Sequence, residues 1–306
     1  AGFAWPPFLG GWVGYAGYDT VRYLEPSKLP FDAAPPDDRG LPDIHLGQYR
    51  ELAVFDEVSK VLHAIAVVVV DEHESVDAAW EDGCARLEAS VDRLQTTPTP
   101  PAAGLFGLDP TRRSEVPLDS SVPRERFEAM VERGRAYIAA GDVFQVVLSQ
   151  RFRRRTEADP FDVYRALRVV NPSPYMFYLQ APGAILVAAS PELLCSHDGR
   201  GRVVNRPLAG TRKRGADAVE DRALETDLLA DAKERAEHVM LVDLGRNDLG
   251  RVCEPASIAL DEVMAVERYS HVMHLSSTVS GRLREGLDAW DLLRGCLPVG
   301  TVSGAP

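Results

Sequence analysis

Residues 193–205 read LLCSHDGRGRVVN, and this stretch decides the fold class. Asp198-Gly199-Arg200-Gly201 supplies turn residues between two short runs, 193–197 and 202–205, which predicts a β-hairpin. Further adjacent strand pairs are expected at 51–56 with 61–70, at 176–180 with 184–189, and at 264–266 with 272–281. Strands that follow one another as hairpins, rather than alternating strictly with helices, favour a mostly antiparallel α+β fold over a Rossmann fold.

The run at 61–70 is rich in β-branched residues, so we expect a strand that is buried on both faces. A further strand is expected at 143–152. Helices are expected at 76–94, 162–170, 220–229, 232–244 and 287–297. The clearest helical period places one apolar face on Phe127, Met130, Val131, Tyr137 and Ile138. Pro123 suits the first turn of that helix, and Gly141 suits its left-handed C-terminal cap.

A proline-rich stretch divides the chain. Pro98, Pro100 and Pro101 lie among threonines and alanines, a composition typical of linkers. We therefore predict an N-terminal portion at 1–95, a linker at 96–118 and a C-terminal portion at 119–306.

Composition excludes several classes of protein. The 306 residues are 45% hydrophobic and 26% charged, as in ordinary globular proteins, and 34 basic against 46 acidic residues leave a net charge of −12. This balance disfavours a nucleic-acid partner, and an anionic ligand needs locally arranged cations. The longest apolar run, at 64–70, is too short for a membrane helix. Four widely spaced cysteines form no C-x-x-C pair, so we expect isolated thiols in a cytoplasmic protein.

The stretch from Asp231 to Val242 is the most informative for chemistry. Glu234 and Glu237 are three residues apart on an expected helix, so their carboxylates share a face. Asp231 as N-cap with Glu234 at the third helical position also resembles a capping box. Glu237 borders the buried stripe, where a carboxylate is costly unless it is paired with a cation or a metal. A hard-metal site and a solvated or salt-bridged face are both open.

Three other features suggest a site for a small anion. The basic segment at 207–215, between glycines, could receive a carboxylate or phosphate, or be a solvated turn. Glu192 enters an apolar strand and could have a raised pKa and donate a proton, or point to water. His274 lies in an apolar strand, as a catalyst or as a core histidine. Together they suggest an enzyme that acts on a small anionic substrate with Mg²⁺.

The second half resembles the chorismate-utilising enzymes, and within them anthranilate synthase component I. The matching motifs, in the family's order, are GDVFQ (141–145), NPSPYM (171–176), ASPELL (189–194), RPLAGTR (206–212), KERAEH (233–238), LVDLGRND (241–248), VMHL (272–275) and GTVSGAP (300–306). Residues 11–25 resemble the family's N-terminal portion. The resemblance implies antiparallel sheets packed as a sandwich with helices outside, and a chorismate-binding catalytic portion at 119–306.

The resemblance also implies an activity. Chorismate is aminated at ring carbon 2 by ammonia from a glutamine amidotransferase partner, with Mg²⁺ as cofactor, and pyruvate is then lost to give anthranilate in tryptophan biosynthesis. The hydroxyl at carbon 4 leaves with the help of an acid, which contributes roughly 10²–10⁴-fold. Mg²⁺ held by carboxylates would bind the substrate's ring carboxylate.

Residue roles are carried over from the matching motifs. Glu237 and Glu234 match the metal site. Glu192 matches the acid near the leaving oxygen or the pyruvyl group. Gly210 and Thr211 match substrate contacts, whereas His274 and Thr301 match residues near the carbon 4 hydroxyl and the ring carboxylate. A tryptophan feedback pocket is implied at Asn171, Pro172, Ser173, Tyr175 and Met176.

Two positions separate this sequence from relatives with other products. Covalent aminodeoxychorismate synthases carry a lysine nucleophile where Ala209 stands. Isochorismate and salicylate synthases carry a lysine at the position of Gln145, where it acts as a base toward water. The resemblance places Gln145 itself at the substrate. Both residues favour anthranilate synthase, with aminodeoxychorismate synthase component I as the alternative.

The family's pattern continues beyond Pro306 with a helix that supplies further metal carboxylates and a glycine-rich substrate segment. We therefore expect the chain to be a piece of a longer protein and to bind Mg²⁺–chorismate poorly by itself. A non-catalytic tryptophan-binding or partner-binding fragment is a third hypothesis.

Overall fold

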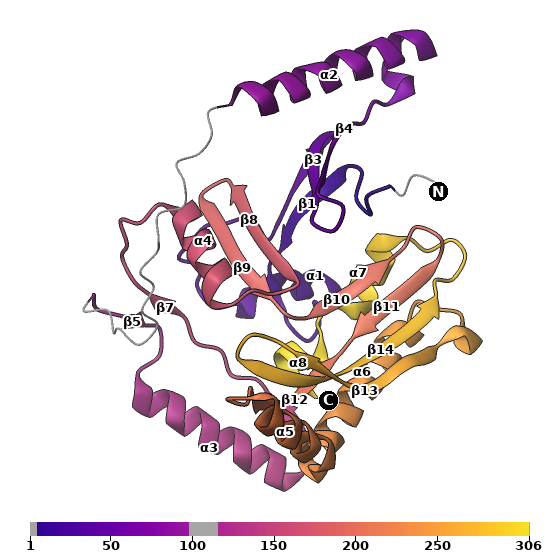
Figure 1. Cartoon of the computed structure of the whole chain (residues 1–306). Helices are drawn as coiled ribbons and strands as arrows, with labels where there is room; N and C mark the ends of the chain where they lie inside the picture. Colours follow the sequence, from indigo (N-terminus) through magenta and orange to yellow (C-terminus); the bar gives the residue numbers. More distant parts are fainter. Residues whose placement is uncertain (1–4, 98–115, 306) are drawn as a thin grey trace. The chain divides into compact units, whose positions relative to one another are not determined.

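The computed structural model describes residues 5–97 and 116–305, except for the side chain of Thr301 (Figure 1). The chain forms two compact units, Ala1–Thr20 with Pro35–Gly107, and Val21–Ala34 with Leu108–Pro306. Residues 21–34 therefore group with the second unit although they precede most of the first. Of the predicted linker at 96–118, residues 98–115 lie outside the described part of the chain.

The first unit consists of two pairs of strands and a long helix. The pairs are β1 (Gly11–Ala16) with β2 (Ile44–Tyr49) and β3 (Glu51–Asp56) with β4 (Val61–Ala66), both antiparallel. Short turns η1 (Tyr18–Thr20) and η3 (Val70–Glu72) connect them to neighbouring segments. Helix α2 (Val76–Thr96) begins where the Ser75 hydroxyl accepts the Ala78 N–H, and it packs against β4.

The predicted strand at 61–70 is wrong in length and burial. Strand β4 ends at Ala66, and Val61 and Leu62 are 46% and 49% exposed. The reason is that β3 is its sole strand partner in the described part of the chain, so the end of the hairpin is open to solvent.

The second unit contains most of the secondary structure. Its helices and 3-10 turns are α1 (Val21–Leu24), η2 (Phe31–Ala33), α3 (Arg124–Ala140), α4 (Pro160–Val170), α5 (Ala218–Ala230), α6 (Ala232–Gly250), η4 (Pro255–Ser257), α7 (Ala289–Cys296) and α8 (Gly300–Ser303). Its strands are β5 (Asp119–Ser120), β6 (Gln145–Val146), β7 (Phe152–Arg153), β8 (Tyr175–Ala181), β9 (Ala184–Ser190), β10 (Leu193–His197), β11 (Arg202–Arg206), β12 (Leu208–Lys213), β13 (Ala259–Arg268), β14 (Val272–Arg282) and β15 (Gly304–Ala305).

Strand β14 is the centre of the largest sheet. It pairs with β11 and then β12 along one edge and with β13 along the other, and β10 pairs with β11. Every strand pairing in the described residues is antiparallel, which confirms the predicted α+β class with antiparallel sheets. The 193–205 hairpin forms as expected, with Asp198 accepting backbone N–H groups of its own turn.

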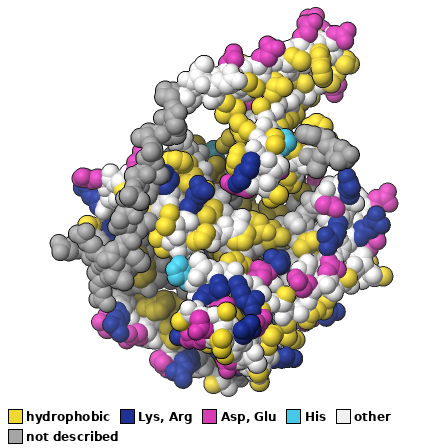
Figure 2. Space-filling model, viewed as in Figure 1, with side chains coloured by type: hydrophobic (Ala, Val, Ile, Leu, Met, Phe, Trp, Pro, Cys, Tyr) yellow, Lys and Arg dark blue, Asp and Glu magenta, His cyan; other side chains and the backbone are white. Residues whose placement is uncertain are grey.

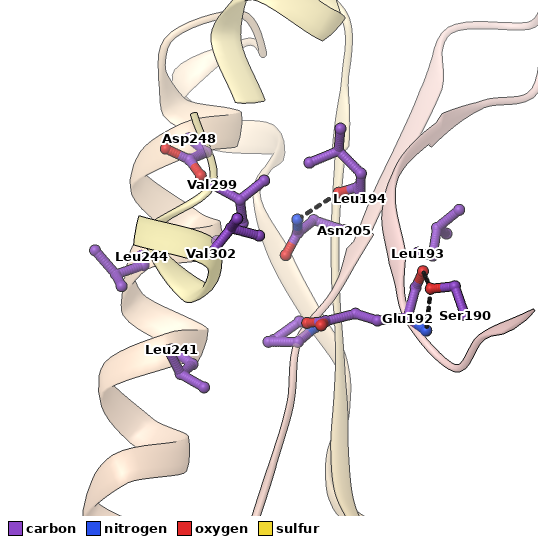
Figure 3. A pocket seen from close by; sticks show the side chains of 12 residues that line it. Ser190, Glu192, Leu193, Leu194, Asn205, Leu241, Leu244, Asp248, Val299 and Val302 are labelled. Carbon is purple, nitrogen blue, oxygen red and sulfur yellow. Dashed lines mark hydrogen bonds between the residues drawn. The ribbon is translucent and has the colours of Figure 1, made fainter. Parts of the chain in front are cut away.

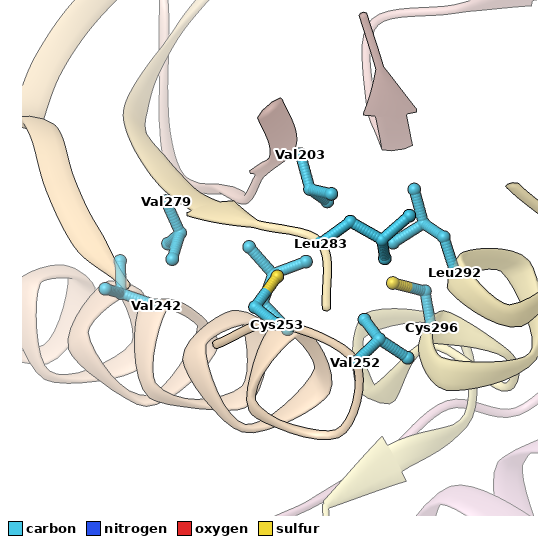
Figure 4. Packing of buried hydrophobic residues seen from close by; sticks show 9 residues of the cluster. Val203, Val242, Val252, Cys253, Val279, Leu283, Leu292 and Cys296 are labelled. Atoms are coloured by element: carbon cyan, nitrogen blue, oxygen red, sulfur yellow. The ribbon is translucent and has the colours of Figure 1, made fainter. Parts of the chain in front are cut away.

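The core lies between this sheet and two helices (Figure 4). Helix α6 packs against β11, β12 and β14, and α7 packs against α6 and β10. Side chains from these elements, and from the residues just after α6 and β14, form a buried cluster of Val203, Val242, Leu249, Val252, Cys253, Val279, Leu283, Leu292 and Cys296. Figure 4 labels all of them except Leu249. Burial of such side chains supplies most of the stabilisation of the unit.

Aspartates begin the helices that follow β12 and β14. Asp217 caps α5, Asp231 caps α6, and Asp288 forms a reciprocal capping box with Asp291 at α7. The Asp231 carboxylate accepts the N–H groups of Lys233 and Glu234, which confirms the predicted N-cap. The Asp231 N–H itself donates to the carbonyl of Asp227 in the preceding helix.

Two other expectations about local structure are corrected. The basic segment expected as a loop at 207–215 is largely strand β12, because its backbone pairs with β14. The strand expected at 143–152 is reduced to β6 and β7, which pair with the short strands β15 and β5 respectively. A long strand does not form there because each of these partners is only two residues long.

The close packing of α6 on β11 gives a stability prediction. A Cβ at Gly245 would lie 2.5 Å from Asn205 Oδ1, so Gly245→Ala should lower the free energy of unfolding by about 1–3 kcal/mol. Gly250→Ala, on the same helix, is the matched control because its nearest neighbour atom is 3.8 Å away, and it should be neutral or stabilising by up to about 1 kcal/mol. Urea unfolding measures both, and equal effects of the two substitutions would contradict the packing described.

Candidate active site

A cavity of about 170 Å³ lies in the second unit, between the strands of residues 190–207 and one face of α6 (Figure 3). In Figure 3 the carboxyl group of Glu192 and the amide of Asn205 project from the strand side, and Asp248 lies on α6 opposite them. The lining residues are Ser190, Glu192, Leu193, Leu194, Asn205, Pro207, Leu241, Leu244, Gly245, Asp248, Val299 and Val302. A mostly apolar cavity with a few polar groups is typical of a small-ligand site.

The periodicity of α6 extends this cavity wall toward the predicted metal ligands. Leu241, Leu244 and Asp248 are spaced by three and four residues, so they share one face of the helix. Glu237 lies four residues before Leu241, and Glu234 three before Glu237, on the same face. With a rise of roughly 1.5 Å per residue, Glu237 is about 6 Å along the helix axis from Leu241.

Burial perturbs both carboxyl groups of the cavity. Desolvation raises the pKa of Glu192, and the Leu208 N–H, 3.4 Å from Glu192 Oε1, only partly offsets this shift. Desolvation raises the pKa of Asp248 to about 6, against a smaller opposing effect of the Arg251 charge. A raised pKa favours the protonated acid, as the sequence suggested for Glu192.

Thr211 and His274 face each other across β12 and β14. Thr211 Oγ1 is 3.0 Å from His274 Nδ1, and the Gly210 carbonyl oxygen is 3.2 Å from the same nitrogen. A carbonyl can only accept, so a hydrogen on Nδ1 satisfies this contact and leaves Nε2 as the free acceptor of the neutral ring. The structure therefore brings together three of the predicted site residues.

Gly210 makes this arrangement possible. It lies at a register shift between Ala209 and Thr211, with a φ of +81° that favours glycine. A Cβ there would also lie 3.1 Å from Leu275 Cδ1, so both the backbone and the space require glycine.

The basic residues of β12 form salt bridges with carboxylates of the same chain. Arg212 contacts Asp227 and Asp231 at 2.6 and 2.7 Å and lies 3.9 Å from Glu234. Figure 2 shows the mixture of positive and negative side chains over α5 that results. The Arg212 guanidinium thus links β12 to the start of α6 and holds Glu234 from one side.

Arg214 makes a similar link at the end of the same strand. It binds Asp221 through two nitrogens, at 3.0 and 2.9 Å, and the Gly215 N–H donates to the same carboxylate at 2.8 Å. These bonds lower the pKa of Asp221 to about 2. Arg212 and Arg214 thus bind carboxylates of the chain itself and do not lie in a solvated turn.

The two predicted metal ligands lie three residues apart on α6. In the described part of the chain no three His, Cys, Asp or Glu side chains are grouped to hold a metal ion. Glu234 and Glu237 nevertheless present two half-buried carboxylates on one helix face. Because Mg²⁺ is commonly held by one or two carboxylates plus water and substrate oxygens, this donor set fits Mg²⁺.

The remaining predicted site residues lie on other elements. Gln145 is on β6 beside β15, and its Oε1 is buried with no hydrogen-bond partner among the described residues. Thr301 lies in α8, and its side chain is outside the described part. The feedback residues Asn171, Pro172, Ser173, Tyr175 and Met176 run from the end of α4 into β8, where Tyr175 pairs with Ser190 of the cavity.

Comparison with known proteins identifies the family. The family model described as chorismate binding enzyme matches residues 3–306. The chain belongs to the chorismate-binding enzyme family. The family motifs at Gly210–Thr211, Glu234–Glu237 and His274 thus lie on two strands and a helix that pack together in one unit, and Glu192 lies in that unit between β9 and β10.

Individual relatives are anthranilate synthases. The chain is 59% identical to anthranilate synthase alpha subunit 1 of rice, Oryza sativa, over 98% of its own length and 52% of that protein. It is 47% identical to anthranilate synthase component 1 of Streptomyces coelicolor, over 98% and 58% of the two chains. The crystal structure of anthranilate synthase component I from Streptococcus pneumoniae matches with a TM-score of 0.82 and 40% identity, covering 100% of this chain and 64% of that one.

The chain thus spans about half the length of the curated relatives it matches. Its match to the Streptococcus structure over its whole length confirms the predicted fold class and the resemblance to anthranilate synthase component I. No described helix has the length and apolar character needed to cross a bilayer.

Sequence reasoning about this chorismate-binding fold missed Asn205 and Asp248. Asn205 is 6% and Asp248 9% exposed, and both line the cavity. The spacing of four and then seven residues from Glu237 through Leu241 to Asp248 could have indicated that Asp248 shares the helix face of Glu237. The sequence prediction ended the helix at Leu244, whereas α6 continues to Gly250 and carries Asp248 into the site.

Asp248 predicts a pH dependence of stability. Its pKa of about 6 exceeds the unfolded value, so the native state binds more protons between about pH 4 and 6, and unfolding free energy falls as pH rises through that window. Asp248→Asn should remove this loss, and the variant should gain on the order of 2 kcal/mol relative to wild type between pH 4 and pH 7.5.

Denaturant unfolding at the two pH values measures this difference. Asp243→Asn is the matched control, because Asp243 is an exposed carboxylate on the same helix, paired with Arg246 at 3.1 Å. If the difference in unfolding free energy between Asp248→Asn and wild type were the same at both pH values, this would contradict the burial cost assigned to Asp248.

Proposed function

We propose that this chain is the chorismate-binding part of an anthranilate synthase large subunit. The whole protein would add ammonia to chorismate and release pyruvate, giving anthranilate for tryptophan synthesis, with ammonia supplied by a glutamine amidotransferase subunit. The main support for this proposal is the 47–59% sequence identity to anthranilate synthases over 98% of this chain. The component and subunit names of these relatives support a partner subunit.

Ala209 supports direct attack by ammonia. It is 8% exposed on β12, next to Gly210, and its methyl group carries no nucleophile. A covalent enzyme–substrate adduct therefore cannot form at this position. Gln145 likewise supports amination over hydroxylation, because an amide does not act as a base toward water at neutral pH.

Glu192 would supply the proton for the leaving group. Leu208 N–H contacts Oε1, so Oε2 is free to carry a proton, and burial keeps the acid protonated to higher pH. His274 would present Nε2 to the substrate, since Nδ1 is occupied by Gly210 and Thr211. The apolar side chains around Glu192 would exclude water, which strengthens both interactions.

The metal would be Mg²⁺, with Glu237 and Glu234 among its ligands. When bound, Mg²⁺ would neutralise the substrate's ring carboxylate. The two carboxylates share one face of α6 because they are three residues apart, and Arg212 lies 3.9 Å from Glu234. Without the metal, the carboxylates of the substrate and the net negative charge of the protein would repel each other.

We also propose that tryptophan inhibits the enzyme by binding at Asn171–Met176. A cytoplasmic location is proposed as well. Residues Tyr175 and Met176 pair with β9, which ends at Ser190 in the cavity wall. A ligand that shifted β8 would therefore act on the strand that positions Glu192. This connection supports feedback control of the proposed reaction.

Product analysis tests the proposed function. Full-length protein incubated with chorismate, ¹⁵N-ammonium and Mg²⁺ should give ¹⁵N-labelled anthranilate and pyruvate, identified by mass. Formation of 4-amino-4-deoxychorismate would instead identify aminodeoxychorismate synthase component I. Absence of any aminated product would refute amination and favour a non-catalytic tryptophan-binding or partner-binding protein.

Glu237→Gln tests the metal assignment in the full-length protein. Loss of the ligand charge should raise the Mg²⁺ concentration needed for half-maximal rate by about tenfold or more. Asp243→Asn removes a carboxylate from another face of the same helix and should leave this concentration unchanged. A Glu237→Gln enzyme with unaltered Mg²⁺ dependence would show that this carboxylate is not a ligand.

A further inference from the structure

Apart from the Glu192 carboxyl group, the polar side-chain atoms that the cavity wall leaves free are hydrogen-bond acceptors. The Asn205 Nδ2 donates to the Leu194 carbonyl at 2.7 Å, and since a carbonyl can only accept, Oδ1 must be on the other side of the amide. The Ser190 hydroxyl donates to the Glu192 carbonyl at 3.0 Å. These two bonds use the side-chain donors in the cavity wall.

The acceptors, by contrast, are unpartnered. Among the described residues, no hydrogen bond reaches the Asp248 carboxylate or Asn205 Oδ1, although the two side chains are 9% and 6% exposed. Figure 3 shows the Asn205 oxygen directed toward α6, with Asp248 on the opposite wall. Two acceptor oxygens that face one cavity and have no partner in the described part of the chain can both be reached by a single small donor.

The cavity restricts what that partner can be. Its volume of about 170 Å³ admits only small molecules, and its remaining wall is apolar, from Leu241, Leu244, Val299 and others. A ligand with acceptors or negative charge would face the carboxyl groups of Glu192 and Asp248. A small cation whose surface consists of N–H donors satisfies the free oxygens of Asp248 and Asn205.

We propose that this cavity binds an ammonium ion, held by Asp248 and by Asn205 Oδ1 and facing Glu192. Ammonium carries four N–H donors and no acceptor, which matches the wall. The assignment rests on the proposed amination for its purpose, since the ion would be a store of the nucleophile beside the substrate site. The binding itself follows from the cavity alone.

Thermal unfolding of the full-length protein tests the binding. Ammonium chloride at about 100 mM should raise the melting temperature more than equal concentrations of potassium chloride or tetramethylammonium chloride, because neither of those cations donates N–H bonds. Asp248→Asn keeps the side-chain shape but removes the charge. It should weaken ammonium binding about tenfold or more, which reduces the rise in melting temperature at the same ammonium concentration. Asp243→Asn should retain the wild-type response.

Kinetics provide a second readout. In the full-length enzyme, Asp248→Asn should raise KM for ammonium about tenfold or more, and by a larger factor than it raises KM for chorismate. An ammonium response that is absent, equal to that of potassium, or unchanged in Asp248→Asn would overturn the site. Turnover with an unaltered KM for ammonium would also overturn it while the proposed function stands, whereas absence of all turnover would refute the function and leave the binding test to decide the cavity.

Discussion

The buried hydrogen bond between His238 and Ser277 fixes how α6 lies on the sheet. His238 Nε2 and Ser277 Oγ are 2.7 Å apart, and both residues are fully buried. Ser277 Oγ also accepts the N–H of Met264, so its hydroxyl hydrogen is available to neutral His238, whose pKa is lowered by burial. Because His238 follows Glu237 directly, this bond sets the rotation of the helix and therefore which residues face the cavity.

The elements defined by local signals were predictable from the sequence. Helix caps depend on one side chain and its nearest N–H groups, and a hairpin depends on its turn, so Asp231 and the 193–205 hairpin were found. Strand β12 was missed because its arginines suggested a solvated loop, whereas pairing with β14 and links to Asp227 and Asp221 stabilise it. Those partners come from elsewhere in the sequence.

The site was predictable where a side chain's own neighbours constrain it. Glu237 stood out because it borders a buried stripe, but Asp248 lies after Gly245, a residue that locally disfavours helix. In the structure, Gly245 is tolerated because its missing Cβ makes room for Asn205, and the helix continues to Asp248. Sequence periodicity could extend the helix face, but it could not show that Asn205 and Glu192 lie opposite it.

In the proposed function, one face of α6, from Glu234 to Asp248, forms a wall of the substrate site. Crystals of the full-length protein soaked with Mn²⁺ in place of Mg²⁺ test it most directly, through the anomalous difference map. The account predicts a peak within coordination distance of the Glu237 carboxylate, on the face of α6 that continues into the cavity. A bound Mn²⁺ that contacts neither Glu237 nor Glu234 would contradict it.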